Sequence, residues 1–500
     1  MVRLQCAFLV VVQTLVVGCK ATGMSNHVTN AGGLAVTGGG SPAQPRGAAD
    51  ALFDPMVLHE LRFTMPPEVL AAQEKDIRDS AARLRAGQPK GSQDFKATLK
   101  VDGEAAGTVG YRSKGSFGTL ANCFDPVSGE SICKKFSYRI NFAFSNSEQN
   151  YLGLKFINLQ SMSQDSSLMR EVLSLKVFRD AGIAASRSAF AQVYFNDEYK
   201  GVFTLTENVD DEFIAARWPD SKNGLLYQEA WPISESDQYW QSNLANHKSD
   251  AAPLSHATME TLAKDLTGQD KVAVLRHYMD ADYMARYMYA DSLATNYDGI
   301  TRFYCGTVSD HRPDCYNHNF FFYVLPETNQ VWLIPFDLDG TWAYHSKIVD
   351  TSQFIQKAPH WNLIPTDCAQ RFEVWGGVHR PAGCDPLIQA VNGLGDFYRI
   401  GVVERLAKGP LDLQKLANAV DAWTILLARA VQTDSTVNYE HWQAAVADLR
   451  QNVLEERIEG YAKCRTGGFG KSAVRGGYTW SRDHQDLNDG SICWLGKSTH

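Results

Sequence analysis

Hydrophobic and polar positions alternate along the first half of the chain in short runs that predict β-strands. Residues 135–144 place aromatic or aliphatic side chains at every second position, which is the period of a strand with one buried face. Residues 95–101 and 108–112 flank an Asp-Gly turn, and residues 190–195 and 199–205 flank an Asn-Asp turn, as the strands of β-hairpins do. The first half of the chain is therefore expected to be rich in sheet.

Other segments carry the spacing of helices. Residues 167–180 place Leu, Val and Met side chains on one helical face, and Asp165 or Ser166 can cap the start of that helix. Residues 281–294 predict a second helix, which is rich in aromatic side chains. Residues 53–66 open with a strand pattern and are followed by a start signal for a helix. Helices are thus expected among the strands.

The second half of the chain contains one further pair of strands and then mostly helices. Residues 320–325 and 331–336 are apolar and are joined by a polar turn. After residue 386 most segments have helical spacing, notably residues 411–432 and 439–464. Because sheet-forming segments come first and helix-forming segments later, the sequence predicts an α+β fold with a sheet-rich N-lobe and a helix-rich C-lobe.

Composition and charge exclude several classes of protein. With 500 residues, of which 44% are hydrophobic and 21% charged, the chain can bury a sizeable core and is not globally disordered. The net charge is −8 and no basic block stands out, so nucleic acid is not expected as a partner. Beyond the N-terminus, no apolar run is long enough to suggest a membrane span.

The N-terminus has the pattern of a secretion signal, with Arg3 before a mostly apolar stretch at residues 4–17. The stretch ends in Gly-Cys, which resembles the cleavage box of a bacterial lipoprotein, although ordinary signal cleavage is an alternative. Residues 20–50 are rich in small residues and predict a flexible tether. We therefore expect a signal peptide over residues 1–19, export to the bacterial cell envelope, and a membrane anchor through a lipidated Cys19.

The cysteine pattern also fits export. Apart from Cys6 and Cys19, eight cysteines fall into four pairs of sequence neighbours, two of them with a spacing of ten. An even number of cysteines in an exported chain suggests disulfides. Pairing between neighbours is the simplest connectivity, but the sequence leaves other connectivities open. The neighbouring pairs are Cys123 with Cys133, Cys305 with Cys315, Cys368 with Cys384, and Cys464 with Cys493.

Carboxylates follow the second strand of the predicted pair. Residues 331–336 run directly into Asp337-Leu338-Asp339, and burial of that strand would place the first carboxylate at the end of the sheet. Two hard oxygen ligands at such a point suit Mg²⁺ or Mn²⁺. A pair of solvated turn residues, or a helix cap, is the alternative interpretation of the same residues.

Two further polar residues stand close to predicted element ends. Asp298 follows the helix that ends near residue 294 and could be a general base or only a turn residue. Asn319 opens the strand at residue 320, where a neutral oxygen could complete a metal shell. A turn residue at the edge of a strand is the alternative for Asn319.

A basic segment lies in the sheet-rich half. Residues 112–118 form a Gly/Ser loop around Ser116, and the backbone N–H groups of such a loop can approach phosphates. Lys135 begins the next strand, where a lysine that faces a bound metal could hold a phosphate. Loop and lysine are followed in order by Asp298, Asn319 and Asp337, which is the layout of an ATP–metal phosphotransfer site.

Seven motifs occur in an order that resembles the CotH kinase family, the spore-coat-protein-H type of atypical protein kinases, over roughly residues 53–464. The motifs lie at residues 111–116, 134–140, 167–183, 193–207, 296–299, 319–323 and 334–339.

The resemblance implies an atypical two-lobed kinase-like fold that holds ATP between its lobes and needs Mg²⁺ or Mn²⁺. It implies a role for each of several residues. These are Asp298 as the catalytic aspartate, Lys135 and Ser116 at the phosphates, Glu207 near adenine at the lobe hinge, Asp337, Asn319 and Asp339 at the metal, and Glu171 as a partner of the lysine.

The implied N-lobe covers residues 51–208 and the C-lobe residues 209–464, with a tail at 465–500 that a disulfide could tie down. The implied function is a secreted or surface-anchored kinase that phosphorylates Ser or Thr of exported proteins. A non-catalytic surface or adhesive protein is the main alternative, and a different nucleotide-dependent transferase is another. Insertions at residues 119–133 and 301–317 lie beside the expected site and leave the substrate open.

Overall fold

The computed structural model describes most of the chain between residues 42 and 450, all of it within one compact unit. The predicted signal peptide, the tail and the cysteine pairs 305/315 and 464/493 lie outside the described residues. The described ranges are 42–43, 45, 47–91, 93–116, 119–233, 236–247, 254–301, 318–342, 361, 368–369, 372–374, 377–379, 381–410 and 412–450.

Seven strands of the first half close into a barrel in the order β1-β2-β3-β4-β5-β7-β6. Neighbouring strands are antiparallel, except that β1 and β6 pair in parallel, with Leu58 opposite Phe190, and so close the barrel. The strands are β1 (Leu58–Thr64), β2 (Phe95–Val101), β3 (Glu104–Lys114), β4 (Ser137–Asn141), β5 (Phe156–Gln160), β6 (Ser188–Phe195) and β7 (Glu198–Glu207).

The alternation seen in the sequence becomes the inside and outside of this barrel. Buried and exposed residues alternate strictly along β2, as a strand with one buried face requires. The helix α1 (Pro67–Arg85) adds Ile77 and Ala81 to the barrel core. The β6–β7 turn consists of Asn196 and Asp197, whose φ angles of 48° and 67° suit the twist of a two-residue hairpin.

The second half is mainly helical and carries a three-stranded sheet in the order β10-β9-β8. Its strands are β8 (Leu225–Gln228), β9 (Phe320–Val324) and β10 (Val331–Pro335), and the short strands β11 (Phe372–Val374) and β12 (Gly377–His379) pair separately. α2 (Arg170–Asp180) lies between β5 and β6 in the sequence. The later helices are α3 (Asp211–Arg217), α4 (Asp237–Ser242), α5 (Ala257–Asp265), α6 (Lys271–Tyr278), α7 (Ala281–Leu293), α9 (Pro386–Asn392), α10 (Asp396–Lys408), α11 (Leu413–Gln432) and α12 (Tyr439–Asp448).

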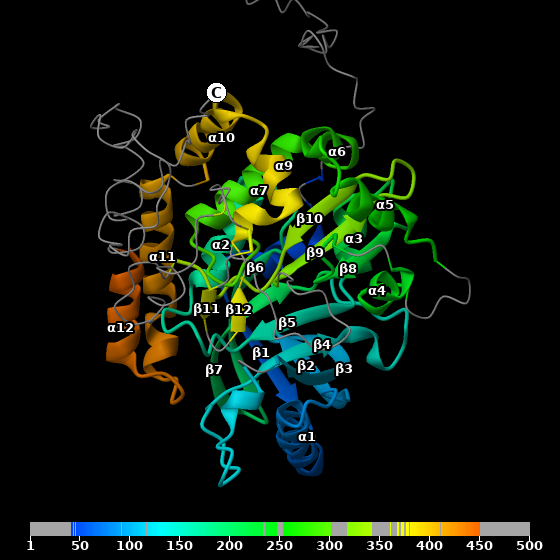
Figure 1. Cartoon of the computed structure of the whole chain (residues 1–500). Helices are drawn as coiled ribbons and strands as arrows, with labels where there is room; N and C mark the ends of the chain where they lie inside the picture. Colours follow the sequence, from blue (N-terminus) through cyan, green and yellow to red (C-terminus); the bar gives the residue numbers. More distant parts are fainter. Residues whose placement is uncertain are drawn as a thin grey trace, which may run out of the picture. The chain divides into compact units, whose positions relative to one another are not determined.

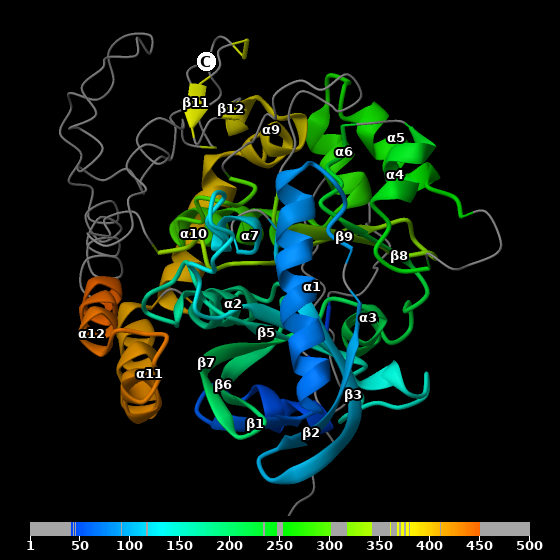
Figure 2. The ribbon, with the colours of Figure 1, turned by 90° about the horizontal axis from the view of Figure 1, so that it is seen from below.

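The described residues form two hydrophobic cores, one for each half of the fold. One core fills the barrel, and the other joins α2, the β8–β10 sheet and the later helices. Figure 1 shows α1 beneath the barrel strands, whereas α5, α6, α9 and α10 gather at the top, and the view from below in Figure 2 brings α1 to the front. The predicted α+β class, with strands early and helices late, is confirmed.

Several predicted elements have different bounds in the structure, and β3 (Glu104–Lys114) is longer at both ends than the strand expected at residues 108–112. The strand expected over residues 135–144 covers only β4, because residues 142–144 turn into a short 3₁₀ helix. The helix expected from residue 167 begins at Arg170, because Leu168 has a φ of 63° that no α-helix tolerates. Asp165 nevertheless organises this start, since its carboxylate accepts the backbone N–H groups of Ser167 and Arg170.

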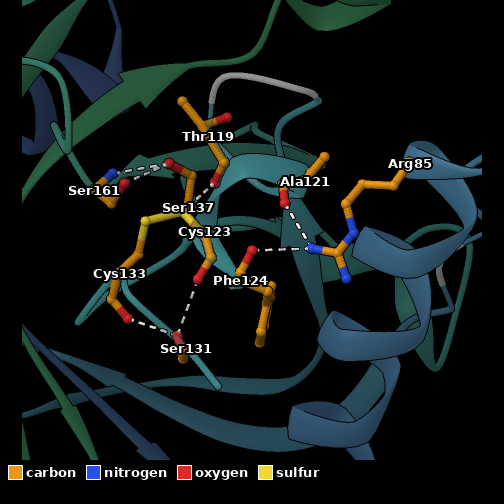
Figure 3. The surroundings of a disulfide bond; sticks show 9 residues. All are labelled: Arg85, Thr119, Ala121, Cys123, Phe124, Ser131, Cys133, Ser137 and Ser161. Carbon is orange, nitrogen blue, oxygen red and sulfur yellow. Dashed lines mark hydrogen bonds between the residues drawn. A yellow bond between two sulfur atoms is a disulfide. The ribbon is translucent and has the colours of Figure 1, made fainter. Parts of the chain in front are cut away.

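Two of the four disulfides between sequence neighbours are confirmed, Cys123–Cys133 and Cys368–Cys384. Figure 3 shows how the first is held: the Ser131 hydroxyl donates to the carbonyls of both cysteines. The Arg85 guanidinium of α1 donates to the carbonyls of Ala121 and Phe124. The disulfide loop is thereby fixed against α1.

Replacing both Cys123 and Cys133 with serine is expected to lower the free energy of unfolding by about 2–3 kcal/mol, because the crosslink closes a ten-residue separation and restricts the unfolded chain. Urea unfolding of the double variant against the parent measures the change. An unchanged midpoint would contradict it. The variant, rather than a reducing agent, isolates this bond from Cys368–Cys384.

Among the residues that the structure describes, no helix combines the length and the apolar character needed to cross a lipid bilayer.

Candidate active site

The β9–β10 hairpin brings Asn319 and Asp337 to the same end of the sheet. Phe320 pairs with Pro335, so the residue before β9 and the residues after β10 are neighbours, and the Phe336 N–H donates to the Asn319 carbonyl at 3.0 Å. Asn319 and Asp337 have φ angles of 65° and 53°, which non-glycine residues rarely adopt. Asparagine and aspartate adopt these angles more readily than other non-glycine residues do, so both positions suit the residues found there.

Asp298 joins this pair through the Asn319 amide. The Asn319 Nδ2 donates to the Asp298 backbone carbonyl at 2.9 Å and to its Oδ2 at 3.0 Å. This arrangement uses the amide nitrogen and turns the amide oxygen of Asn319 away from Asp298. Asp298, Asn319 and Asp337, which the sequence placed in one site, therefore lie together.

A buried aspartate on α7 that the sequence analysis missed fixes the loop around Asp298. The Asp291 Oδ1 accepts the Asn296 side-chain N–H at 2.7 Å, and its Oδ2 accepts the Thr301 hydroxyl at 2.7 Å. The fold requires glycine at position 299, because a Cβ there would lie 2.2 Å from Asn296 Nδ2. Gly299 does not have a positive φ, so space rather than backbone freedom explains this glycine.

The segment after β10 docks on α2. The Thr341 hydroxyl lies 2.7 Å from the Ser174 hydroxyl, and the Trp342 indole N–H donates to the same oxygen at 2.8 Å. Glu171 precedes Ser174 by three residues, so both side chains lie on one face of α2. The helix therefore presents Glu171 toward the Asp337 segment.

Four carboxylates lie near enough for their charges to act on one another. Burial raises the pKa of Asp339 well above its ordinary value, and the charges of Asp337, Glu171 and Asp298 raise it further. Burial also raises the pKa of Glu171 to about 7, with a further contribution from Asp337, whereas Lys114 lowers it. We call Glu171, Asp298, Asp337 and Asp339 the carboxylate cluster.

Lys114, at the end of β3, is the lysine that the structure brings to the carboxylate cluster. Its ammonium lies 4.7 Å from the centre of the Phe336 ring, and Phe336 immediately precedes Asp337. Glu171 is 2% exposed, and its Oε2 has no hydrogen-bond partner among the described residues. In the sequence, this lysine belongs to the Gly/Ser loop at residues 112–118 and to the motif at residues 111–116, and no role of its own was expected for it.

Lys135 has other partners. Its ammonium donates to the Val202 carbonyl at 2.6 Å and lies 3.7 Å from an Asp434 carboxylate oxygen. Burial lowers its pKa to about 8, against the opposing effect of the Asp434 carboxylate, and no carboxylate of the cluster is among the described groups that shift it. The structure therefore does not bring Lys135 together with Asp298, although the family resemblance implied a shared site.

The carboxylate of Glu207 is fully engaged in ion pairs. The Arg187 and Arg217 guanidiniums donate to its two oxygens at 2.6 and 2.7 Å, and the Arg187 backbone N–H donates at 3.0 Å. Burial alone would raise the pKa of Glu207, but the two guanidiniums outweigh it and hold the pKa at about 2. The side chain expected near adenine thus joins β7 to α3.

Ser116 lies two residues beyond Lys114, at the start of the loop that follows β3. Its side chain is exposed, and its carbonyl accepts the backbone N–H groups of Leu120 and Ala121. The Lys90 ammonium donates to the carbonyls of Ser113 and Gly115 and so supports the same loop. Ser116 is therefore an exposed residue two positions from the lysine of the cluster.

The donor set fits a hard divalent cation. In the described part of the chain, no three His, Cys, Asp or Glu side chains are already arranged to enclose a metal. Mg²⁺ does not need such a cage, because it usually takes one or two carboxylates together with phosphate oxygens and water. The pKa of Asp339 is raised because its charge is buried beside other carboxylates. A bound cation would supply the positive charge that favours the ionised form.

Comparisons with known proteins identify the family of the chain. A family model described as CotH kinase protein matches residues 112–463. The chain is 26% identical over 212 residues to the inner spore coat protein H of Bacillus subtilis (strain 168). That alignment covers 42% of this chain and 55% of the relative, so the chain spans about half the length of the curated relative it matches.

Among solved structures, the chain is similar to a Helicobacter pylori proinflammatory kinase, CtkA, with 9% identity and a TM-score of 0.29. The match covers 67% of this chain and 92% of that one. At this TM-score nothing is transferred from that kinase to the site.

Proposed function

The chain belongs to the CotH kinase protein family, and from this premise we propose that it transfers the γ-phosphoryl group of ATP to Ser or Thr hydroxyls of exported proteins. The observation that carries the proposal is the carboxylate cluster, with Asn319 and Lys114 beside it. Phosphoryl transfer needs positioning and charge stabilisation more than covalent chemistry, and these groups supply both.

Asp298 is the proposed proton acceptor. The bond between the γ-phosphorus and the bridging oxygen breaks, a bond from phosphorus to the substrate hydroxyl oxygen forms, and the hydroxyl proton passes to the Asp298 carboxylate. The Asn319 amide, which donates to Asp298 Oδ2, would hold that carboxylate in place. The hydrogen bonds of Asp291 to Asn296 and Thr301 would keep the whole loop in position.

Asp337, Asp339 and the amide oxygen of Asn319 are the groups that would hold Mg²⁺ or Mn²⁺. The cation, when bound, would neutralise negative charge on the transferred phosphate. Lys114 would contact the phosphates from β3, and Glu171 would orient the lysine, as charge pairing across the cluster suggests. The backbone of the Ser116 loop would add N–H donors to the phosphates.

Export and membrane attachment belong to the same proposal. Disulfides form and persist in oxidising compartments, and the structure contains two of them. We propose that the N-terminal segment directs export to the bacterial cell envelope, where a lipidated Cys19 would hold the protein at the membrane. The substrates would then be exported proteins that share this compartment.

The function is tested with the full chain, produced in an oxidising compartment and incubated with ATP labelled on either the γ- or the α-phosphate, with Mg²⁺ or Mn²⁺. Incorporation of the γ label alone, with a mass increase of about 80 Da per site and loss of the signal in EDTA, supports a kinase. Incorporation of the α label identifies a nucleotidyl transferase. No incorporation and no ATP-dependent change in melting temperature would favour the non-catalytic alternative.

Lys114→Met is expected to lower the rate of phosphoryl transfer about 10²- to 10³-fold, because it removes a positioned cation from the phosphates while keeping the length of the side chain. Initial rates of γ-label incorporation measure the effect. Lys100→Met, an exposed lysine on β2, is the matched control and should retain the parent rate. Equal rates for the two variants would exclude Lys114 from the site.

A further inference from the structure

A cavity of about 510 Å³ lies between α1, the segment that precedes β4, and the β6–β7 hairpin. Pockets of this size commonly hold small molecules. Ser435 and Thr436, in the connection from α11 to α12, form part of its edge. No residue of the carboxylate cluster lines this cavity, and neither does Lys114, so the cavity is separate from the candidate active site.

The floor of the cavity is aromatic and contains a buried amide with donor capacity to spare. Tyr138, Phe195 and Phe203 are all buried there. Gln73 of α1 is 1% exposed, and its amide contacts the Tyr138 phenol. An amide carries two N–H groups, and Nε2 has no further acceptor in the described part of the chain. A buried amide N–H without an acceptor is unfavourable, so a ligand atom that accepts from Gln73 would be stabilised.

Lys135 supplies a second donor and a charge. Its side chain is only 9% exposed, and one of its three N–H groups is used by the Val202 carbonyl. Asp434 is only a partial partner at 3.7 Å, because its oxygens already accept the N–H groups of Val202 and Thr436. The Lys135 ammonium therefore keeps donor capacity toward the cavity that it lines.

The charge of the lining is opposite to that of the chain. Four cations, from Arg78, Lys134, Lys135 and Lys200, line the cavity with the two carboxylates of Glu74 and Glu198, whereas the whole chain carries a net charge of −8. Lys200 is paired with Glu198 at 2.7 Å and Lys135 lies 3.7 Å from Asp434, so the surplus of positive charge is small. A positive surplus in the lining favours an anion over a cation. The aromatic side chains favour a flat apolar body on the same ligand, by stacking or edge contacts.

The disulfide loop makes one wall rigid. Phe124, Ser131 and Cys133 line the cavity, and the bond from Cys123 to Cys133 joins the two ends of this wall (Figure 3). Arg85 ties the same loop to α1, which provides the opposite wall. A preformed cavity of this kind loses little conformational entropy when a ligand binds.

We propose that this cavity binds a small aromatic carboxylate, with its ring against Tyr138, Phe195 and Phe203 and its carboxylate accepting from Gln73 Nε2 and Lys135 Nζ. The site is independent of the proposed phosphoryl transfer, and its ligand would be an effector or a cargo of the protein rather than a substrate of the kinase.

The test uses the full chain and three probes, 2-naphthoate, its neutral counterpart 2-naphthamide, and acetate, with binding followed by calorimetry and saturation-transfer NMR. Naphthoate is expected to bind saturably and at least about tenfold more tightly than either of the other two, since ring and charge both contribute. Equal binding of naphthamide, or no binding of naphthoate at millimolar concentration, would overturn the proposal.

Two variants place the ligand in the cavity. Gln73→Leu removes the amide donor at similar volume, and Lys135→Met removes the ammonium; each should weaken naphthoate binding at least about tenfold. Lys135→Met leaves Asp434 without its cation and can unfold the chain, so Gln73→Leu, checked by circular dichroism, decides the outcome. Lys100→Met should bind as the parent does. If Gln73→Leu binds naphthoate as tightly as the parent does, the assignment of the ligand to this cavity is wrong. Asp337→Asn is expected to bind naphthoate like the parent, because Asp337 belongs to the candidate active site and not to this cavity.

Discussion

Asp337→Asn is expected to reduce the rate of phosphoryl transfer about 10³-fold, equivalent to roughly 4 kcal/mol of transition-state stabilisation. The substitution keeps the shape of the side chain and the backbone conformation, since asparagine tolerates the φ of 53° found at this position. It removes the negative charge that would hold the divalent cation. Initial rates of γ-label incorporation at saturating ATP and Mg²⁺ measure the loss.

The matched control for this experiment is Asp220→Asn, which makes the same change at an exposed position outside the carboxylate cluster. It should retain the parent rate. The melting temperature of Asp337→Asn should not fall, because removing one of four neighbouring carboxylates relieves repulsion. If Asp337→Asn has the parent rate, Asp337 does not bind the metal. If the variant loses both its activity and its folded state, the loss of activity is due to unfolding and the catalytic role of Asp337 is not supported.

Glu207→Gln is expected to destabilise the fold by about 3–5 kcal/mol, the largest stability effect that we predict for a single side chain. Glu207 is 1% exposed and neutralises Arg217, which is 2% exposed, together with Arg187. The amide leaves the buried Arg217 guanidinium without a counter-charge. Urea unfolding at pH 7 measures the difference between variant and parent.

The effect of Glu207 depends on pH in a defined direction. Its folded-state pKa, about 2, lies below the ordinary value of 4.5, so ionised Glu207 stabilises the folded state above pH 4.5. That contribution, on the order of 3 kcal/mol, is lost as pH falls from 4.5 toward 2. The stability difference between parent and Glu207→Gln should therefore shrink over this interval.

Glu148→Gln, at an exposed position, should show no such pH-dependent difference. A constant difference between the parent and Glu207→Gln from pH 7 to pH 2 would mean that the Arg187 and Arg217 pairs do not stabilise the ionised carboxylate.

Local patterns were sufficient to predict the parts of the site that lie close in sequence. The two apolar runs at residues 320–325 and 331–336 predicted a hairpin, and a hairpin necessarily brings Asn319 beside the residues after β10. Asp298 could be assigned to the same site only from the order of the motifs. It lies 21 positions before Asn319, and the residues between them include some outside the described ranges, so no local pattern predicts their contact. The structure supplies that contact.

The sequence could not show whether Lys114 or Lys135 lies beside the carboxylate cluster. Alternation assigns a residue to one face of a strand, but it does not say which end of a closed barrel that residue reaches. Lys114 reaches the carboxylate cluster because β3 extends two residues further than the pattern at residues 108–112 indicated. Lys135 instead donates to the Val202 carbonyl and lies 3.7 Å from Asp434, which is almost 300 positions later in the chain. A local sequence pattern cannot predict contacts between such distant residues.

The parallel pairing of β1 with β6 has a consequence for the order in which the protein folds. Every other strand pair of the barrel is antiparallel, and most join neighbours in the chain, so they can form soon after synthesis. β1 must wait until residues 188–195 are available. Distant pairings of this kind slow folding, since the entropy of closing a long loop is lost before the contact forms. In a chain that crosses a membrane N-terminus first, β1 would emerge before β6. Its unpaired edge could then pair with other strands or other chains until β6 has also crossed.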